Sequence, residues 1–389
     1  MGRSRGRVRG ILSLCLAASV CTACGGSGVR SDSGTGSAFS GSGSTSSTSE
    51  NESGASSAES VSSSSAEEMI SLPEDQDLAV DYTDVRGIQA EAGSSLAVVV
   101  KGLDSAYWKA VKEGASTAID DLNEYLGYSG SDKVQMTFEG TSDDTDVDTQ
   151  INTIDAVLSE NPMALCLAAI DMNSCQAQLE SARESEIPVI ILDSGVKSDL
   201  ATCSCQTDNE SAGGQAAQKL CQAIGDSGEI AIVAHMKSSQ TSADRVAGFR
   251  QELTQNHSQV SVAETIYENE DETIAEALSY LLEAYPGLDG IFCTNETMAE
   301  EVLDALSDMD REDIQLVGFD AGKKQINAIQ EGREYGTVCQ NPYGMGYASV
   351  IAAFRAAAGQ TVDSYIDSGY QWIDQTNINL EENQKYLYQ

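Results

Sequence analysis

Residues 187–195 read IPVIILDSG, a short aliphatic run followed by turn-forming residues. The same pattern recurs along the chain from about residue 95 onward. The aliphatic run 189–192 is too short for a helix, and turn-forming residues follow it at once. Runs of this kind are typical of strands that are buried on both faces of a parallel sheet. We predict such strands at residues 96–100, 134–138, 164–169, 189–192, 230–234, 260–267, 290–294, 315–319 and 337–340.

Longer amphipathic segments lie between these runs. In residues 107–125, for example, Val111, Ala118 and Leu122 recur at helical spacing. We predict helices at residues 107–125, 147–158, 212–224, 243–253, 273–284, 298–306 and 347–358. Alternating strands and helices predict an α/β fold of parallel sheets covered by helices on both faces. The pattern begins near residue 95 and is too long for one comfortable core, so we expect two lobes.

The first residues have the marks of a secretory signal. Four arginines stand at alternate positions from Arg3 to Arg9, an apolar stretch covers 11–20, and Thr22-Ala23 precede Cys24. A cysteine directly after small residues resembles the lipobox of bacterial lipoproteins, although Cys21 stands where an aliphatic residue is usual. We therefore predict a signal peptide over residues 1–23 and a lipid on Cys24 that holds the protein on the extracytoplasmic face of the cell membrane. The alternative is a plain secretory signal in which Cys24 is incidental.

A linker is expected after the signal. Residues 25–68 are mostly Ser, Gly, Thr, Ala and Glu and have almost no large apolar side chain, so they cannot form a core. Residues 69–93 contain a few apolar residues without a clear period, and we assign them to the same linker, with room for a short ordered piece. The predicted disordered linker therefore spans 24–93.

Composition argues against several classes of function. The formal net charge of −39 opposes binding to a phosphate backbone, so we expect no nucleic-acid partner. Seven cysteines follow Cys24, and an odd number cannot all pair within the chain. The only histidines are His235 and His257, which makes a zinc cluster improbable. We expect no metal and no cofactor.

Polar and aromatic residues follow the predicted strands, where ligands bind in open parallel sheets. Carboxylates and carboxamides can hold vicinal hydroxyls, an arginine offers a rigid fork of donors, and aromatic faces can lie against a sugar ring. The set therefore suits a small polyhydroxylated ligand, and it lacks the basic cluster that a nucleotide phosphate needs. The residues that follow the strands are 101–108, 193–195, 235–237, 295–296, 319–320 and 340–341, with Arg245 a little after the fifth strand.

Several of these residues have structural alternatives. Asp193 could merely cap a turn, and Arg245 could pair with a surface acid. We expect one of Tyr107 and Trp108 to pack into the core and Trp108 to be the better platform for a ligand. Phe319 could be core or stacking surface; Glu296 is expected to be an early-helix acid, and His235 and Lys237 offer no strong case.

Motifs strung along residues 96–372 resemble the sugar-binding branch of the type I periplasmic binding proteins. The pieces that carry the resemblance are VVV at 98–100 with Tyr107-Trp108, IPVIILD at 187–193, TDN at 207–209, RVAGF at 245–249, TNE at 294–296, VGFD at 317–320 and QNP at 340–342. The resemblance implies two Rossmann-like lobes joined by three crossing strands, near residues 205–208, 340–341 and 369–372. Lobe 1 would comprise 94–206 plus 341–369, and lobe 2 would comprise 207–340 plus 370–389.

The resemblance also implies that nine of the residues after the strands contact a sugar between the lobes. They are Lys101, Ser105, Tyr107, Trp108, Asp193, Arg245, Asn295, Asp320 and Gln340. Many members have an arginine where Ser194 stands, an Asn-Pro where Ser105-Ala106 stand, and a small polar residue where Lys101 stands. These departures make ribose a doubtful ligand.

We expect a binding protein that delivers a sugar to the permease of an ABC importer. The first alternative is a sensor head that presents a sugar or an autoinducer-type furanosyl compound to a membrane receptor or kinase. An enzyme is the least favoured, because the chain has no Gly-x-Ser-x-Gly elbow and no Gly-x-Gly-x-x-Gly after a strand. A DNA-binding repressor with this core would need an N-terminal headpiece, and a signal and an acidic linker stand there instead.

Overall fold

The computed structural model describes residues 80–269 and 271–388. The chain divides into two units, 1–73 and 74–389, and the described residues belong to the second. The predicted signal peptide, Cys24 and the linker up to residue 79 lie outside the described residues. Within the described part of the chain, no helix combines the length and the apolar character that crossing a membrane requires.

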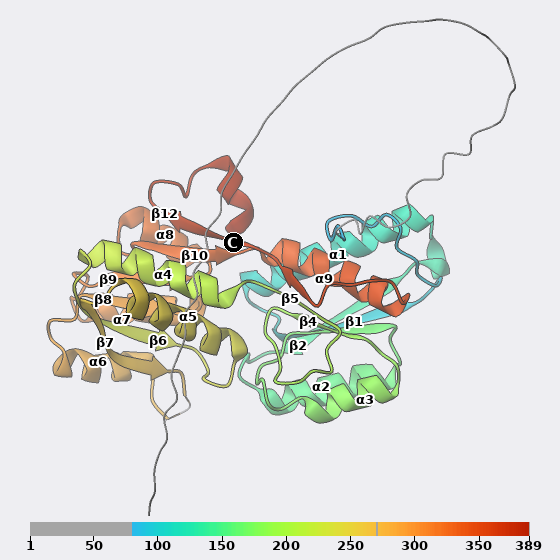
Figure 1. The fold of residues 1–389 in the computed structure, drawn as a ribbon, viewed down its shortest axis with the longest axis horizontal. Coiled ribbons are helices and arrows are strands. Elements are labelled where there is room, and N and C mark those ends of the chain that lie inside the picture. Colours follow the sequence, from blue (N-terminus) through green and yellow to red (C-terminus); the bar gives the residue numbers. More distant parts are fainter. Residues whose placement is uncertain (1–79, 270, 389) are drawn as a thin grey trace, which may run out of the picture. The chain divides into compact units, whose positions relative to one another are not determined.

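Two six-stranded sheets form the framework of the fold, one in each lobe (Figure 1). The sheet of lobe 1 is parallel throughout, in the order β11-β5-β4-β3-β1-β2. Its strands are β1 (Ser95–Gly102), β2 (Gln135–Thr141), β3 (Ala164–Leu167), β4 (Val189–Leu192), β5 (Cys203–Gln206) and β11 (Tyr365–Asp367).

The sheet of lobe 2 has the order β12-β10-β9-β8-β6-β7, and only the edge strand β12 runs antiparallel to its neighbour. Its strands are β6 (Gly228–Ala234), β7 (Val260–Tyr267), β8 (Gly290–Cys293), β9 (Gln315–Phe319), β10 (Gly336–Gln340) and β12 (Tyr370–Asp374). All nine strands predicted from the sequence are present, and the α/β fold with two Rossmann-like lobes is confirmed.

Helices cover both faces of each sheet, because alternate residues of a strand point to opposite faces. In β1, Val98 and Val100 pack with α1 (Ala106–Leu126) and α9 (Pro342–Ala357). Ala97 and Val99 face the other way, toward α2 (Val147–Ser159) and α3 (Gln176–Glu184).

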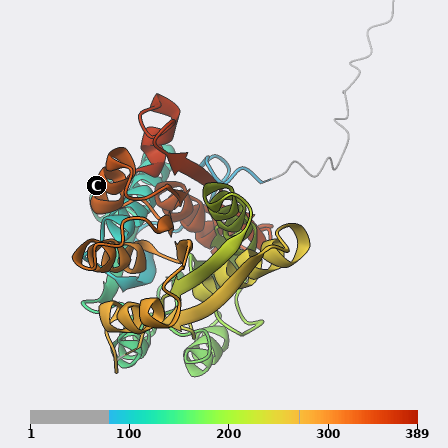
Figure 2. The ribbon, with the colours of Figure 1, turned by 90° about the vertical axis from the view of Figure 1, so that its left-hand side faces the viewer.

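Lobe 2 repeats this arrangement, and Figure 2 shows helices on both sides of its sheet. Ile230 and Ile232 of β6 pack with α4 and α5, whereas Ala231 and Val233 pack with α6 and α7. The helices of lobe 2 are α4 (Asn209–Ile224), α5 (Gln240–Asn256), α6 (Ile274–Ala284), α7 (Glu296–Asp308) and α8 (Lys323–Glu331).

The chain passes between the lobes three times. It leaves lobe 1 after β5, returns to it between β10 and α9, and leaves it again between β11 and β12. A 3₁₀ helix, η2 (Glu381–Tyr386), follows β12, and Figure 1 shows the C-terminus near the place where the lobes meet. Each crossing is short, so the carboxyl ends of the two sheets stay close to each other.

The end of the predicted linker packs on lobe 1, which corrects its assignment as disordered up to residue 93. Val85 and Ile88 are buried in the cluster around α1 and α9. The Tyr82 hydroxyl accepts a hydrogen bond from the Asp363 backbone N–H at 2.7 Å, and the Gln360 amide donates to the Gly87 carbonyl at 2.9 Å. A few apolar residues without a helical or strand period are enough to hold this segment in place, because they pack on a surface that α1 and α9 already form.

Candidate ligand-binding site

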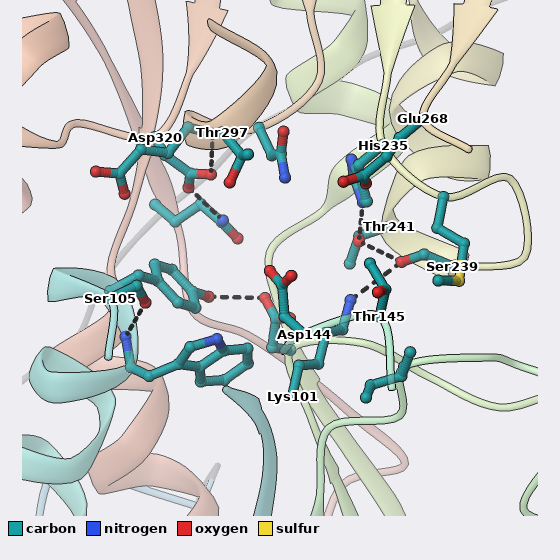
Figure 3. Close-up of a pocket in the computed structure, with 18 of the residues that line it drawn as sticks. Lys101, Ser105, Asp144, Thr145, His235, Ser239, Thr241, Glu268, Thr297 and Asp320 are labelled. Atoms are coloured by element: carbon teal, nitrogen blue, oxygen red, sulfur yellow. Dashed lines mark hydrogen bonds between the residues drawn. The ribbon is translucent and has the colours of Figure 1, made fainter. Parts of the chain in front are cut away.

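A cavity of about 690 Å³, part of it open to solvent, lies where the carboxyl ends of the two sheets meet (Figure 3). Side chains of both lobes line it, as expected for ligand sites of open parallel sheets. All nine residues singled out from the sequence line this one cavity: Lys101, Ser105, Tyr107, Trp108, Asp193, Arg245, Asn295, Asp320 and Gln340.

Asp193 and Asp320 occupy equivalent positions in the two lobes. Asp193 follows β4 and Asp320 follows β9, and each of these strands is third from one edge of its sheet. Both residues have a left-handed backbone, with φ of 64° and 75°, which is uncommon outside glycine. Both are nearly buried, with 5% and 6% of their surface exposed. Each strand end therefore turns an aspartate into the cavity.

Asp193 has an aromatic partner within lobe 1. Its Oδ1 accepts a hydrogen bond of 2.7 Å from the Tyr107 hydroxyl, so this carboxylate does not simply cap a turn. Burial raises the pKa of Asp193, and the nearby charges of Lys101 and Arg245 oppose that rise. The carboxylate is therefore held in a place where ionisation depends on cationic neighbours.

Asp320 is held by three donors. Its Oδ1 accepts from the Gln340 amide at 2.7 Å and from the Tyr388 hydroxyl at 2.8 Å, and its Oδ2 accepts from the Glu296 backbone N–H at 3.2 Å. The Oε1 of Gln340 in turn accepts from the Thr207 hydroxyl at 2.9 Å. Thr207 and Gln340 flank two of the interlobe crossings, so the position of Asp320 is tied to the hinge.

Tyr107 and Trp108 lie in the first turn of α1, where the Ser105 hydroxyl caps the helix by accepting from the Trp108 N–H at 3.2 Å. The two rings meet edge to face with centroids 5.0 Å apart. Both rings line the cavity and both belong to the core of lobe 1, so the expected division into one core ring and one platform does not occur.

Arg245 is buried, with 2% of its surface exposed, so the alternative of a surface ion pair is wrong. Its Nε donates to Asn209 Oδ1 at 2.8 Å, and its NH1 donates to the Thr294 carbonyl at 2.7 Å. The guanidinium lies 3.6 Å above the centre of the Phe319 ring. Phe319 is fully buried, so it is a core residue that packs under Arg245. The guanidinium is thus fixed in place at the wall of the cavity.

A chain of buried polar groups connects the two lobes. Lys101 Nζ donates to Ser239 Oγ at 3.1 Å, and Ser239 Oγ lies 3.1 Å from Thr241 Oγ1. His235 bridges Thr241 and Thr294, with its Nε2 at 3.1 Å and its Nδ1 at 2.8 Å from their hydroxyl oxygens. Because Lys101 belongs to lobe 1 and the other residues to lobe 2, this chain joins the lobes across the cavity wall.

Burial and the nearby cations lower the pKa of His235 well below 6.5, so the ring is neutral at ordinary pH. The Thr294 hydroxyl oxygen already accepts the His235 backbone N–H at 3.0 Å. If Thr294 also donates to Nδ1, then Nε2 can donate to Thr241, and every hydroxyl proton along the chain finds an acceptor. This order of donors favours the tautomer with its proton on Nε2.

The cavity contains residues that the sequence analysis did not select. His235 was named there, but no functional role was argued for it. Glu296 was interpreted only as an acid in the first turn of a helix. Glu296 does stand in the first turn of α7, but it also faces the cavity, and burial and Asp320 raise its pKa to about 8. The other unselected lining residues are Asp144, Thr145, Ile170, Met236, Ser239, Thr241, Glu268 and Thr297.

Comparison with known proteins agrees with this architecture. The family described as "Periplasmic binding protein domain" matches residues 96–361, and the chain belongs to that family. The class is that of the type I periplasmic binding proteins, as the motifs along the chain suggested.

Individual relatives are more distant. The xylitol-binding protein of Mycolicibacterium smegmatis is 24% identical over 55% of this chain, and the match spans 61% of that protein, less than two thirds of its length. The ribose import binding protein RbsB of Haemophilus influenzae is 22% identical over 71% of this chain and 90% of its own length. A carbohydrate transporter solute binding protein from Agrobacterium radiobacter, solved in complex with D-arabinose, aligns with a TM-score of 0.69 at 25% identity, covering 77% of this chain and 99% of that one.

Proposed function

We propose that this protein captures a small sugar or polyol between its two lobes and delivers it to an ABC importer. The observation that carries the proposal is the convergence of Asp193 and Asp320, from equivalent strands of the two lobes, on one cavity with Trp108 and Arg245. The relatives named above support it, since they are described as binding xylitol, ribose and D-arabinose.

The chemistry of the cavity suits an uncharged polyol. Carboxylates accept hydrogen bonds from hydroxyl groups, and Asn295 adds an amide with both donor and acceptor atoms. Trp108 and Tyr107 offer apolar faces for the C–H side of a ring. Among the described residues, Lys101 and Arg245 are the only cations that line the cavity, and acids outnumber them, so the lining favours an uncharged ligand over an anionic one. These acids are Asp144, Asp193, Glu268, Glu296 and Asp320.

The nine residues that we assign as ligand contacts are those that line the cavity and were selected from the sequence. Ser194 stands where many relatives of the family have an arginine, and it is fully buried beside the cavity. We therefore expect a ligand other than ribose, one that does not need a second guanidinium. No catalytic step is part of the proposal.

The location and partners follow from the N-terminal sequence. A lipid on Cys24 holds the protein at the outer face of the cell membrane, and the linker gives the two lobes freedom to reach a permease. The partners are the sugar, the membrane through the lipid, and the ABC permease. The division into lobe 1 (94–206 plus 341–369) and lobe 2 (207–340 plus 370–389) gives the units that would close on the sugar.

A thermal-shift screen tests the sugar-binding role. Ligands that bind the folded state raise its melting temperature by mass action. We expect a saturable rise with at least one pentose, hexose or polyol, and its loss in Asp193→Ala. Absence of any shift across a broad carbohydrate panel would remove the sugar assignment.

Metabolic labelling with a fatty-acid analogue tests the anchor separately. We expect label and membrane fractionation for the natural sequence, and neither for Cys24→Ser. A soluble, unlabelled natural protein would leave the signal peptide in place and refute the lipid.

A further inference from the structure

Three buried polar side chains lie behind the strand end that carries Asp320. They are Gln325 of α8, Thr337 of β10, and Glu334 in the turn between these elements, and at most 1% of each is exposed. They fit because residue 318 is glycine, since a Cβ there would lie 2.3 Å from Glu334 Oε1 and 2.5 Å from Gln325 Nε2. The glycine therefore leaves room for this polar cluster, which lies outside the cavity.

Two side chains of the cluster donate hydrogen bonds to backbone carbonyls, one at Phe319 and one at Asp320. Gln325 Nε2 donates to the Phe319 carbonyl at 3.2 Å and to Glu334 Oε1 at 3.1 Å. Thr337 Oγ1 donates to the Asp320 carbonyl at 2.7 Å. Because the Phe319 carbonyl can only accept, the nitrogen of the Gln325 amide must lie on this side, and its orientation is fixed.

Two oxygens of the cluster are left without a partner. Gln325 Oε1 and Glu334 Oε2 are both buried and neither has a hydrogen bond within the described residues. Both are acceptors when Glu334 is ionised, and two orphaned acceptors in a buried pair are costly. A single proton on Glu334 Oε2, donated to Gln325 Oε1, would satisfy both and complete a cyclic acid–amide pair with the bond already present.

The charges around Glu334 agree with a neutral acid. Arg333, its neighbour in sequence, lowers the pKa of Glu334, but this guanidinium is paired with Glu331 at 2.7 Å. Glu300 is the other charged group that acts on Glu334, and it is an acid; the buried thiols of Cys293 and Cys339 also face it. A carboxylate at position 334 would therefore have no ion-pair partner among the residues that the structure describes.

We infer that Glu334 is a protonated positioning residue, and that its proton locks Gln325 and thereby the strand end that presents Asp320 to the ligand. Glu334 does not touch the cavity and acts only through Gln325 and the backbone of Phe319. The role of Asp320 as a ligand contact rests on the proposed function, but the protonation of Glu334 does not.

The pH dependence has a definite sign. Burial raises the pKa of Glu334 from 4.5 to about 8. The folded protein therefore keeps a proton that the unfolded chain releases above its ordinary pKa. The stability that this group provides is complete below about pH 4.5 and is lost progressively as the pH rises toward about 8.

Two substitutions separate this role from simple packing. Glu334→Gln replaces the acid by an amide that can donate to Gln325 Oε1 and accept from Gln325 Nε2 at any pH. Glu334→Leu keeps most of the volume and removes both bonds. Both variants are made in the full chain and followed by thermal melting at about pH 5 and about pH 8.

At the lower pH we expect Glu334→Gln and the natural protein to have the same melting temperature. At the higher pH the melting temperature of Glu334→Gln should be several degrees above that of the natural protein. The infrared difference spectrum between the natural protein and Glu334→Gln at neutral pH should contain the band of a buried protonated carboxylic acid, because Glu296 contributes its own band equally to both proteins. Amide hydrogen exchange at Glu296 and Ala321 reports the Asp320 region, because these N–H groups donate to Asp320 and to its partner Tyr388. Exchange there should speed up in Glu334→Leu and stay unchanged in Glu334→Gln.

A difference in melting temperature between Glu334→Gln and the natural protein that does not change with pH would overturn the inference, as would an infrared difference spectrum without a carboxylic-acid band. Equal exchange in Glu334→Leu and the natural protein would leave the protonation of Glu334 standing, but it would refute the claim that Glu334 positions Asp320. None of these readouts uses a sugar, so a failed carbohydrate screen would not be mistaken for failure here.

Discussion

Asp193 and Asp320 stand at equivalent places in the two lobes and share a left-handed backbone, yet their surroundings differ. Asp320 accepts hydrogen bonds from Gln340, Tyr388 and the Glu296 backbone, whereas Asp193 accepts from Tyr107. The same turn thus supports a rigid carboxylate in lobe 2 and a more loosely held one in lobe 1. The comparison teaches that the repeated fold supplies the position, while the neighbouring side chains decide how fixed each carboxylate is.

Asp320→Ala should have the largest effect. It removes the proposed hydrogen bonds to the sugar, which would be charge-assisted and worth about 1.5–3 kcal/mol each, so affinity should fall by roughly 100-fold or more. It also leaves the buried donors of Gln340 and Tyr388 unpaired, and the melting temperature should fall by several degrees. Calorimetric titration and thermal melting measure the two effects, and an unchanged melting temperature would show that the three donors do not matter for stability.

Asp193→Ala should weaken binding by about 10- to 100-fold with little loss of stability. The Tyr107 hydroxyl loses its acceptor and the buried Lys101 loses a nearby opposite charge, but removal of a buried carboxylate offsets part of that cost. Tyr107→Phe is the matched control, since it frees the carboxylate but keeps the ring, and it should cost about tenfold or less in affinity. A loss of stability in Asp193→Ala as large as in Asp320→Ala would erase the contrast between the lobes.

The ligand affinity and the stability of the ligand-free protein should respond to pH in opposite directions. Because burial raises the pKa of Asp193, acidification protonates it at a higher pH than an exposed aspartate, and the affinity should fall. The ligand-free protein gains stability from the same proton as the pH falls. In Asp193→Asn the affinity should be lower throughout and should lose this change on acidification. A step in affinity near the ordinary histidine pKa that remains when the other cavity acid of raised pKa is removed, in Glu296→Gln, would contradict the neutral state of His235.

Lys101→Met should have the smallest effect on binding, a loss of several-fold. It removes the Lys101–Ser239 hydrogen bond between the lobes and one of the cations that favour ionised Asp193. Small-angle scattering should show a larger radius of gyration for the ligand-free variant, because the open form gains population. Ser239→Ala, which leaves Lys101 in place, should open the lobes to a similar extent. An unchanged radius in both variants would mean that this bond does not hold the lobes together.

Much of the fold could be predicted from the sequence, because buried parallel strands are recognised from short aliphatic runs. Three of the strands have the predicted bounds: β4, β7 and β9. The elements that were missed are short or polar. Helix α8 has the sequence KKQINAIQE, which is only nine residues long and mostly polar, and β11 is only three residues long.

The candidate site was predictable wherever a residue lies within two positions after a strand, as Asp193, Asn295 and Asp320 do. Tyr388 could not be found in this way, because it lies 68 residues from the Asp320 carboxylate to which it donates. The importance of His235 depends on its burial between Thr241 and Thr294, which a sequence pattern does not reveal. These partners come together only through the packing of the lobes.

Calorimetric titration of the chain from residue 25 onward against pentoses, hexoses and polyols tests the central claim most directly. Asp193→Ala and Asp320→Ala are titrated beside it. The account predicts one carbohydrate that binds with a single site per chain and loses affinity in both variants, more strongly in Asp320→Ala. Binding that survives both substitutions, or no binding by any carbohydrate, would contradict the assignment of this cavity as a sugar site.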